Sequence, residues 1–122
     1  MNSGSYRLHI RVKKNISLQV GALGTIKFPK GDYFYTGSAM KNLRQRIERH
    51  KQKAKPQKWH IDYLLANEFV KIIKIEIFPS ETREECEKNR EILNLPNSWI
   101  PAKEFGSSDC RTCPAHLVGV RV

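Results

Sequence analysis

The sequence predicts an α+β fold in which a small, mainly antiparallel β-sheet is flanked by helices. Apolar side chains alternate with basic ones over residues 6–12, which is the period-two pattern of a half-buried strand. Aromatic and β-branched residues fill residues 32–37 and enrich residues 69–78, so both segments are expected to be strands. Apolar residues recur at helical spacing over residues 38–53, where Ser38 is the expected N-cap of a helix.

Turn and breaker residues place the remaining elements. Residues 16–20 and 25–28 are expected to form a hairpin around a turn that contains two glycines. Helices are expected at residues 59–67 and 81–93, because prolines punctuate the chain near both segments. A last strand is expected at residues 117–122.

The length of the chain indicates one globular unit. A chain of 122 residues can build one hydrophobic core, and no repeat, low-complexity tract or linker divides it, so residues 1–122 are expected to form a single domain. The longest apolar run, residues 72–78, is interrupted by Lys74 and Glu76 and is too short to span a bilayer. The first residues lack the basic and apolar regions of a secretory signal. A protein without membrane contact and with a cytoplasmic location is therefore predicted.

The net charge of +10 is concentrated in the first half of the chain. Residues 1–60 carry 14 Lys and Arg against 2 acidic residues, a net +12, whereas residues 61–122 carry 8 against 10, a net −2. Clustered positive charge attracts polyanions, and each contact to a phosphate adds salt-dependent affinity. Nucleic acid is the expected partner, and a surface charged for solubility or heat tolerance is the alternative.

The cysteines are too few for a disulfide framework. The chain has three, Cys86, Cys110 and Cys113, which predicts a reducing compartment. Together with His116 they offer the ligand types of a tetrahedral zinc site. Only the spacing of Cys110 and Cys113 is typical of such sites, and buried thiols are the alternative. A zinc-stapled interaction domain is thus one function that remains open.

Two predicted strands each carry a tyrosine close to a glycine, and an arginine follows on the first predicted helix. The three motifs are Gly4-Ser5-Tyr6, Tyr35-Thr36-Gly37 and Leu43-Arg44-Gln45-Arg46. In this order they resemble the signature of the GIY-YIG nuclease superfamily, which is Gly-x-Tyr, Tyr-x-Gly and then Leu-x-x-Arg. The chain departs from the compact hairpin of some members, because 28 residues separate the two tyrosines. The hairpin expected within this interval accounts for the extra length.

Further segments resemble one branch of that superfamily. They are residues 37–39, 59–65 and 105–110, so the resemblance covers most of the chain. The branch consists of poorly characterised prokaryotic domains that are sometimes fused to an endonuclease III-type DNA glycosylase. The resemblance implies a GIY-YIG endonuclease-like fold and a divalent-metal-dependent endonuclease that hydrolyses DNA phosphodiester bonds, with a role in DNA repair.

The resemblance also implies roles for individual residues. Tyr6 is implied as the general base or the group that orients the attacking water, Tyr35 as an orienting group, and His50 as a phosphate contact. A phenol has an ordinary pKa near ~10, so a nearby cation has to favour its ionised form. Arg46 lies at the edge of the apolar stripe of its helix, from which it is expected to reach the tyrosines and clamp a phosphate. An ordinary surface arginine, core tyrosines and a packed histidine are the alternatives.

One metal ion is also implied, held largely through a glutamate of a later helix. With Cys86 and Ile92 facing inward, Glu85 lies at the border of the buried face and is the expected ligand, while the other glutamates project outward. A single Mg²⁺ or Mn²⁺ ion held by one carboxylate, waters and a substrate phosphate suits this arrangement. The alternative is that Glu85 pairs with a basic neighbour.

The expected partner is structured or damaged DNA, with RNA as a further candidate and a partner protein that supplies target choice. On a helical wheel Arg49 points away from the tyrosines and Arg44 lies on the far flank, so the basic side of the helix is expected to contact nucleic acid. The residues assigned to this contact are Lys41, Arg44, Arg49, Lys51, Lys53 and Lys55. The rival function is a nucleic-acid-binding module that keeps the fold without catalysis. Binding alone does not require the set of Tyr6, Tyr35, Arg46 and Glu85.

Overall fold

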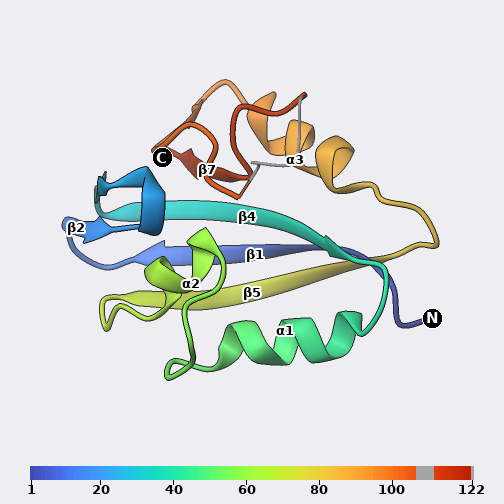
Figure 1. Ribbon diagram of the computed structural model, residues 1–122. Helices are drawn as coiled ribbons and strands as arrows, with labels where there is room; N and C mark the ends of the chain where they lie inside the picture. Colours follow the sequence, from blue (N-terminus) through green and yellow to red (C-terminus); the bar gives the residue numbers. More distant parts are fainter. Residues whose placement is uncertain (107–111, 122) are drawn as a thin grey trace.

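The computed structural model describes residues 1–106 and 112–121 (Figure 1). The strands are β1 (Gly4–Val12), β2 (Ile16–Gln19), β3 (Thr25–Phe28), β4 (Gly31–Ala39), β5 (Val70–Pro79), β6 (Ser98–Trp99) and β7 (Leu117–Val120). The helices are η1 (Gly21–Leu23), α1 (Leu43–Lys51), α2 (His60–Leu65) and α3 (Glu85–Leu93), of which η1 is a 3₁₀ turn. In the described part of the chain, no helix is long and apolar enough to cross a membrane.

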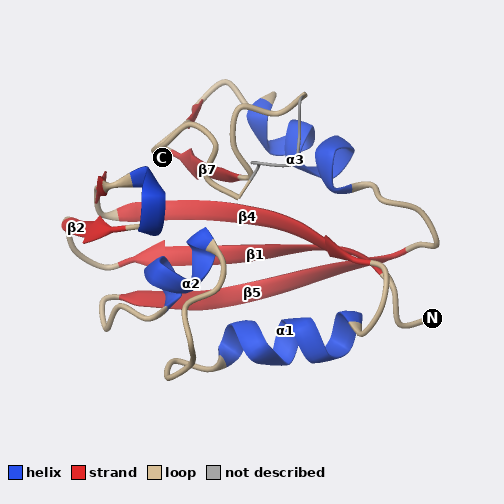
Figure 2. Ribbon diagram, viewed as in Figure 1, coloured by secondary structure: helices blue, strands red, loops and turns tan. Residues whose placement is uncertain are grey.

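The strands form one five-stranded sheet and a separate hairpin (Figure 2). The order of the large sheet is β5-β1-β4-β7-β6, and every neighbouring pair is antiparallel. The hairpin of β2 and β3 lies between β1 and β4 along the chain, so it lengthens the connection without interrupting their pairing. The predicted α+β class with a mainly antiparallel sheet flanked by helices is confirmed, and so is the predicted hairpin.

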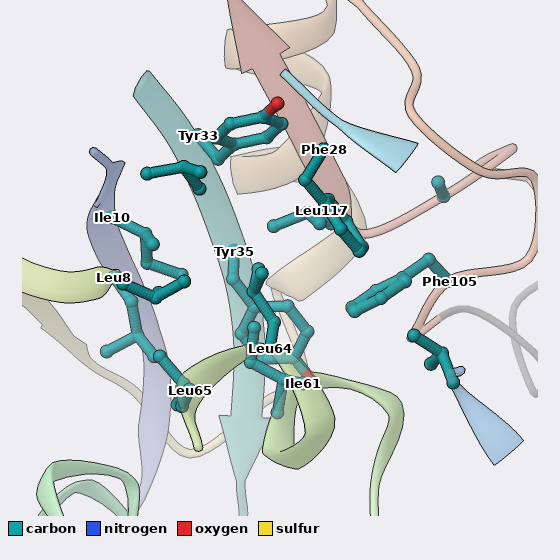
Figure 3. Close-up of a cluster of buried hydrophobic side chains, with 14 of the residues drawn as sticks. Leu8, Ile10, Phe28, Tyr33, Tyr35, Ile61, Leu64, Leu65, Phe105 and Leu117 are labelled. Atoms are coloured by element: carbon teal, nitrogen blue, oxygen red, sulfur yellow. The ribbon is translucent and has the colours of Figure 1, made fainter. Parts of the chain in front are cut away.

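The hydrophobic core lies between one face of the large sheet and the helices α1 and α2 (Figure 3). Leu8 and Ile10 of β1 are fully buried, as are Ile61 and Leu64 of α2. Burial of each such side chain contributes about 1.5–3 kcal/mol to folding. Phe105, from the segment before β7, packs edge to face on the hairpin and closes the core at that side. The alternating pattern of β1 therefore points its apolar side chains at the two helices.

The opposite face of the sheet is covered by α3, and this buries an arginine that the alternating pattern places in solvent. Arg7 is 7% exposed, and its guanidinium donates to the carbonyl oxygen of Lys88 at 2.8 Å and to Glu91 Oε1 at 3.0 Å. Arg7 also pairs with Glu76 on β5. The prediction of a half-buried strand holds at Arg11, which is exposed, and is wrong at Arg7, because a helix distant in sequence packs over it.

The predicted start of the first helix is wrong. β4 continues through Ala39, because β1 extends back to Gly4 and pairs Ser5 with Ser38. Ser38 is therefore a strand residue and not an N-cap, and α1 begins only after Asn42, whose φ of 57° is left-handed. The backbone of the loop is held by Asn2, whose side chain accepts a hydrogen bond from the N–H of Arg44. Strand pairing thus outweighs the capping preference of a serine.

The other boundaries differ by a few residues. The helices predicted at residues 59–67 and 81–93 are shorter, spanning His60–Leu65 and Glu85–Leu93. The latter starts late because Ser80 forms a turn, in which its hydroxyl accepts from the N–H of Thr82. The predicted strands at residues 69–78 and 117–122 are observed as β5 and β7, and residue 122 lies outside the described residues.

We expect Arg7→Ala to lower the free energy of unfolding by about 2 kcal/mol or more, because buried hydrogen bonds from a charged group are lost. Arg11→Ala is the matched control, since Arg11 lies on the same strand and pairs with Asp32 at an exposed position, where ion pairs contribute little. Urea unfolding of both variants provides the measurement. Equal losses of unfolding free energy in the two variants would show that the burial of Arg7 contributes nothing to stability.

Candidate active site

A cleft of about 810 Å³ opens where β1 begins and β4 ends. β7 pairs with β4 over residues 32–35, and the Thr36 N–H donates to the carbonyl oxygen of His116, so within the described chain no strand covers the edge of β4 beyond Thr36. Side chains from both faces of the sheet meet around this open edge. Arg46 and Trp59 reach it from the side of α1 and α2, and Glu85 reaches it from α3.

Three residues of the sequence motifs and the glutamate chosen from the helical wheel line this cleft together. They are Tyr6, Tyr35, Arg46 and Glu85. They come from four separate elements, β1, β4, α1 and α3. The fifth, His50, lies behind Tyr6 and is 2% exposed. The fold therefore gathers the residues on which the resemblance rests at one place.

The Tyr6 ring occupies space that is free because the facing residue, Gly37, has no side chain. It lies opposite Gly37 in the pairing of β1 with β4, and a Cβ atom on Gly37 would stand 2.5 Å from the Tyr6 hydroxyl oxygen. Real Cβ atoms do not approach so closely, so a larger residue has to displace the ring. The glycine of Tyr-x-Gly therefore makes room for the tyrosine of Gly-x-Tyr on the neighbouring strand.

The Tyr6 hydroxyl forms a buried hydrogen bond of 2.7 Å with Nε2 of His50. Burial raises the pKa of Tyr6 to about 12, and the guanidinium of Arg46 opposes part of this shift. Burial also lowers the pKa of His50 to about 4, with Lys55 as the next cause. At neutral pH both groups are uncharged, and in the tautomer that carries its proton on Nδ1 the Nε2 atom of His50 accepts from the Tyr6 hydroxyl. A short path for a proton thus leads from the cleft to α1.

Arg46 is fixed at the wall of the cleft by two contacts. Its Nη1 donates to the backbone carbonyl oxygen of Ser38 at 3.0 Å, and its guanidinium lies 4.7 Å from the ring centre of Trp59. Both contacts leave further N–H groups of the guanidinium for other acceptors, because this group carries five donors. The predicted position of Arg46 at the border of the apolar stripe agrees with this geometry.

Arg49 does not line the described part of the cleft, and its side chain instead binds residues of the segment around the start of α2. Its guanidinium lies 4.5 Å from the ring centre of Trp59 and forms two hydrogen bonds with the buried carboxylate of Asp62. Asp62 also accepts from the backbone N–H groups of Lys58 and Trp59, and these contacts lower the pKa of its carboxyl group although burial opposes them. This network folds the segment before α2 back onto α1, which a helical wheel cannot show.

Tyr35 is packed between the core and the cleft. Its ring centre is 6.4 Å from that of Tyr6 and 6.1 Å from that of His50, and burial raises its pKa well above the ordinary value. A Cβ on Gly106 would lie 2.9 Å from the Tyr35 ring, so the loop approaches closely here. His60 holds this loop, because its Nδ1 accepts a hydrogen bond of 2.9 Å from the Gly106 N–H.

Glu85 stands on the opposite wall with a partly exposed side chain. Its Oε2 lies 3.6 Å from Nδ1 of His116, and its Oε1 lies 3.8 Å from Nη1 of Arg83. The carboxylate therefore has basic neighbours, as the alternative explanation expects, and it also lines the cleft. Among the described residues, Glu87 is the other carboxylate of the lining.

Most lysines and arginines assigned to nucleic acid from the sequence are engaged elsewhere. Lys53 donates to three backbone carbonyls, Lys55 donates to two, and Lys51 pairs with Glu48. Lys41 and Arg44 are exposed on the surface beside α1 and do not line the cleft. With Arg49 included, the six residues assigned from the sequence therefore lie around α1, and none of them lines the described part of the cleft.

The basic residues that do line the cleft with Arg46 were missed at the sequence level. They are Lys58, Arg83 and Arg90. Lys58 and Arg83 lie in loops, where no periodicity predicts the direction of a side chain, and Arg90 lies on the last turn of a helix that also carries acidic residues. Four basic side chains and two glutamates thus line the described part of the cleft. This excess of positive charge favours the binding of an anion.

Beside Glu85, the fold brings together Cys86, Cys113 and His116. Their Sγ and imidazole nitrogen atoms all lie within 4.8 Å of one another, so this cluster can hold a metal ion. Cys110, which the sequence groups with them, lies outside the described residues, as do residues 107–109 of the segment that resembles the nuclease branch.

A family model matches residues 5–122, and its description is "Domain of unknown function DUF123". The matched range contains the four candidate residues of the cleft, Tyr6, Tyr35, Arg46 and Glu85. No curated protein and no solved structure matches the chain significantly. No activity is attached to the family, so the chemistry of the cleft has to supply the argument for function.

The buried pair of Tyr6 and His50 predicts a pH dependence of stability. Because the folded state keeps His50 unprotonated down to a pKa of about 4, whereas the unfolded chain takes up a proton near 6.5, acid favours unfolding between these values. We expect the free energy of unfolding to fall by up to about 3 kcal/mol from pH 7.5 to pH 4 on this account.

The measurement is urea unfolding across this pH range for the native chain and for His50→Gln, in which an amide replaces the titrating imidazole. The variant should lose less stability than the native chain as the pH falls. His9→Gln, on the other face of the sheet, is the control and should keep the full loss. Identical pH profiles for all three proteins would contradict a buried, unprotonated His50.

Proposed function

Because the chain belongs to the DUF123 family, whose function is unknown, we propose from the cleft that it is a divalent-metal-dependent endonuclease that hydrolyses phosphodiester bonds of DNA. One observation carries the proposal: Tyr6, Tyr35, Arg46 and Glu85 line one cationic cleft. The ordered motifs that resemble the GIY-YIG nuclease superfamily support membership in it and the same activity. Structured or damaged DNA, met during repair, is the substrate that this resemblance favours.

The cationic side of the cleft suits a phosphate. Arg46 is held in place by Ser38 and Trp59, so little conformational freedom is lost when its guanidinium binds two phosphate oxygens. Lys58, Arg83 and Arg90 extend the positive field along the lining, where they can contact neighbouring phosphates of the same strand. In this proposal Arg46 clamps the scissile phosphate and stabilises the charge that develops on it.

The hydrogen bond between Tyr6 and His50 suits the transfer of a proton from the attacking water. A resident phenolate is disfavoured, because burial raises the pKa of Tyr6 to about 12. We therefore assign Tyr6 as a relay: its oxygen accepts a proton from water while its own proton passes to Nε2 of His50, 2.7 Å away. Burial disfavours the protonated imidazole, so the proton on His50 returns through the Tyr6 hydroxyl to solvent in the cleft.

The oxygen donors on the cleft wall fit a hard divalent cation. Glu85 offers a carboxylate with a side chain 25% exposed, and it lines a cleft that Tyr6 and Tyr35 also line. Glu85 would hold one Mg²⁺ or Mn²⁺ ion, with waters and a substrate phosphate as the other ligands. When bound, the ion supplies Lewis-acid neutralisation of the phosphoryl oxygens and a lowered pKa of coordinated water.

A nucleic-acid-binding module without catalysis is the second candidate. The excess of basic over acidic side chains along the cleft favours it equally, because positive charge alone suffices for binding. It differs from the nuclease proposal in one respect, since it gives no function to the buried pair of Tyr6 and His50. A partner protein that selects the target is compatible with both functions.

We expect the purified chain to cleave at least one of nicked, branched or base-damaged DNA in Mg²⁺ or Mn²⁺, with RNA included in the panel. Tyr6→Phe should reduce the cleavage rate about 100-fold or more, because the proton relay is lost. Tyr33→Phe is the matched control: its hydroxyl donates to the Pro29 carbonyl away from the cleft, so cleavage should be retained.

Two further pairs test the other assignments. Arg46→Ala should abolish most cleavage and weaken binding, whereas Arg44→Ala, on the exposed side of the same helix, should change cleavage little. Glu85→Gln should lose cleavage and retain binding. Cleavage that survives in Tyr6→Phe, Arg46→Ala and Glu85→Gln rules out the mechanism, and binding without cleavage by the native chain across the panel supports the second candidate.

A further inference from the structure

The Cys86, Cys113 and His116 cluster joins two segments that are distant in sequence. Cys86 lies on the first turn of α3, and the other two residues lie in the segment that leads into β7. Cys113 and His116 are buried, with exposures of 6% and 2%, and Cys86 is half-buried. The metal-ligating atoms of all three converge within 4.8 Å. Such convergence of two thiols and an imidazole is the donor arrangement of many zinc sites.

The geometry of the cluster is close to that of a tetrahedral site. Cys86 Sγ lies 3.8 Å from His116 Nε2. Zinc bonds of about 2.3 Å to sulfur and about 2.0 Å to nitrogen at a tetrahedral angle place these two atoms about 3.5 Å apart. The side chains therefore need only a small adjustment to bind one ion. Sulfur and imidazole donors also select Zn²⁺ over the harder Mg²⁺.

The other nitrogen of His116 has the environment that metal-bound histidines usually show. Nδ1 lies 3.6 Å from Glu85 Oε2, and no described hydrogen bond satisfies this buried atom. A histidine that binds zinc through one nitrogen commonly directs the other to a carboxylate, which fixes the ring and its tautomer. Glu85 is placed to act as this outer partner after a small approach.

We propose that the chain binds one Zn²⁺ through Cys86 Sγ, Cys113 Sγ and His116 Nε2, with Glu85 as the outer partner of His116. The fourth tetrahedral position takes a ligand in addition to these three side chains. The ion clamps α3 to the segment before β7 and so fixes the wall of the cleft on which Glu85 stands. Only the significance of this wall for cleavage rests on the proposed nuclease function, because zinc binding itself is independent of it.

The first test measures metal in the full chain, purified under reducing conditions from a culture supplied with zinc. We expect about one zinc ion per chain and a lower melting temperature after removal of zinc by a chelator. Co²⁺ added to the zinc-free protein should give the intense near-ultraviolet absorption of thiolate ligands and the visible bands of a tetrahedral site. Zinc-free protein that shows no thiolate band with Co²⁺ would overturn the proposal, whether or not the chain cleaves DNA.

The variants assign the ligands. Cys113→Ser and His116→Gln should each weaken zinc binding in a competition with a coloured chelator, and Cys113→Ser should also reduce the thiolate band. His9→Gln, outside the cluster, should bind zinc as the native chain does. Because a ligand variant can fail to fold, the Co²⁺ spectrum of the native chain remains the decisive measurement.

The function of Glu85 as the outer partner has a separate readout. Glu85→Gln should keep one zinc ion per chain but bind it about 10–100-fold more weakly. Glu87→Gln is the matched control, because Glu87 lies on the same helix and lines the cleft but is not part of the cluster. Equal zinc affinity in the native chain and in both variants would leave Glu85 without this function. Loss of cleavage with unchanged zinc content in Glu85→Gln would concern the nuclease proposal only.

Discussion

The arrangement of the cleft depends on the cross-strand pair of Tyr6 and Gly37. The absence of a side chain on Gly37 lets the Tyr6 ring lie flat enough against β4 for its hydroxyl to reach His50 on α1. α1 is held in turn by Leu43 and Ile47, which are buried against the sheet. Any residue larger than glycine at this point displaces the ring and with it the hydrogen bond to α1. A single missing Cβ therefore couples two strands, a helix and the chemistry of the site.

The open edge of β4 explains why the cleft lies where it does. Helices on opposite faces of a sheet are normally kept apart by the sheet itself, which is about 10 Å from each packed layer. Where β7 stops pairing, side chains from α1 and α3 can approach the same space. Burial then makes Tyr6 and His50 neutral, while Arg46 and its basic neighbours remain at the solvent-facing wall. The site thus combines the buried hydrogen bond between Tyr6 and His50 with a charged surface.

Glu85 connects two donor sets of different chemical character. Toward the cleft, its carboxylate and the tyrosine hydroxyl groups are hard oxygen donors, which suit Mg²⁺ or Mn²⁺. Behind it, the thiols and His116 are softer donors, which suit zinc. One carboxylate oxygen lies 3.6 Å from Nδ1 of His116 and the other lies 3.8 Å from Nη1 of Arg83, so Glu85 has a basic neighbour on each side. The two proposals therefore differ in the metal that each donor set would hold.

The sequence by itself determined the class of the fold, most of the strands and the positions of Tyr6, Tyr35 and Arg46 on their elements. These features are local, because periodicity and glycine spacing act over a few neighbouring residues. Glu85 was also placed correctly at the border of its helix, although its contact with His116 could not be inferred from the wheel.

Only the tertiary structure decided which charged residues line the cleft and which bind partners elsewhere in the fold. Arg7 is buried by Glu91, 84 residues later in the chain, and Arg49 is bound by Asp62 across a loop. Lys53 and Lys55 satisfy backbone carbonyls, whereas Lys58, Arg83 and Arg90 reach the cleft from positions that no periodicity predicts. Long, flexible cations find their acceptors wherever packing brings unsatisfied oxygens near, and that depends on the whole fold and not on adjacent residues.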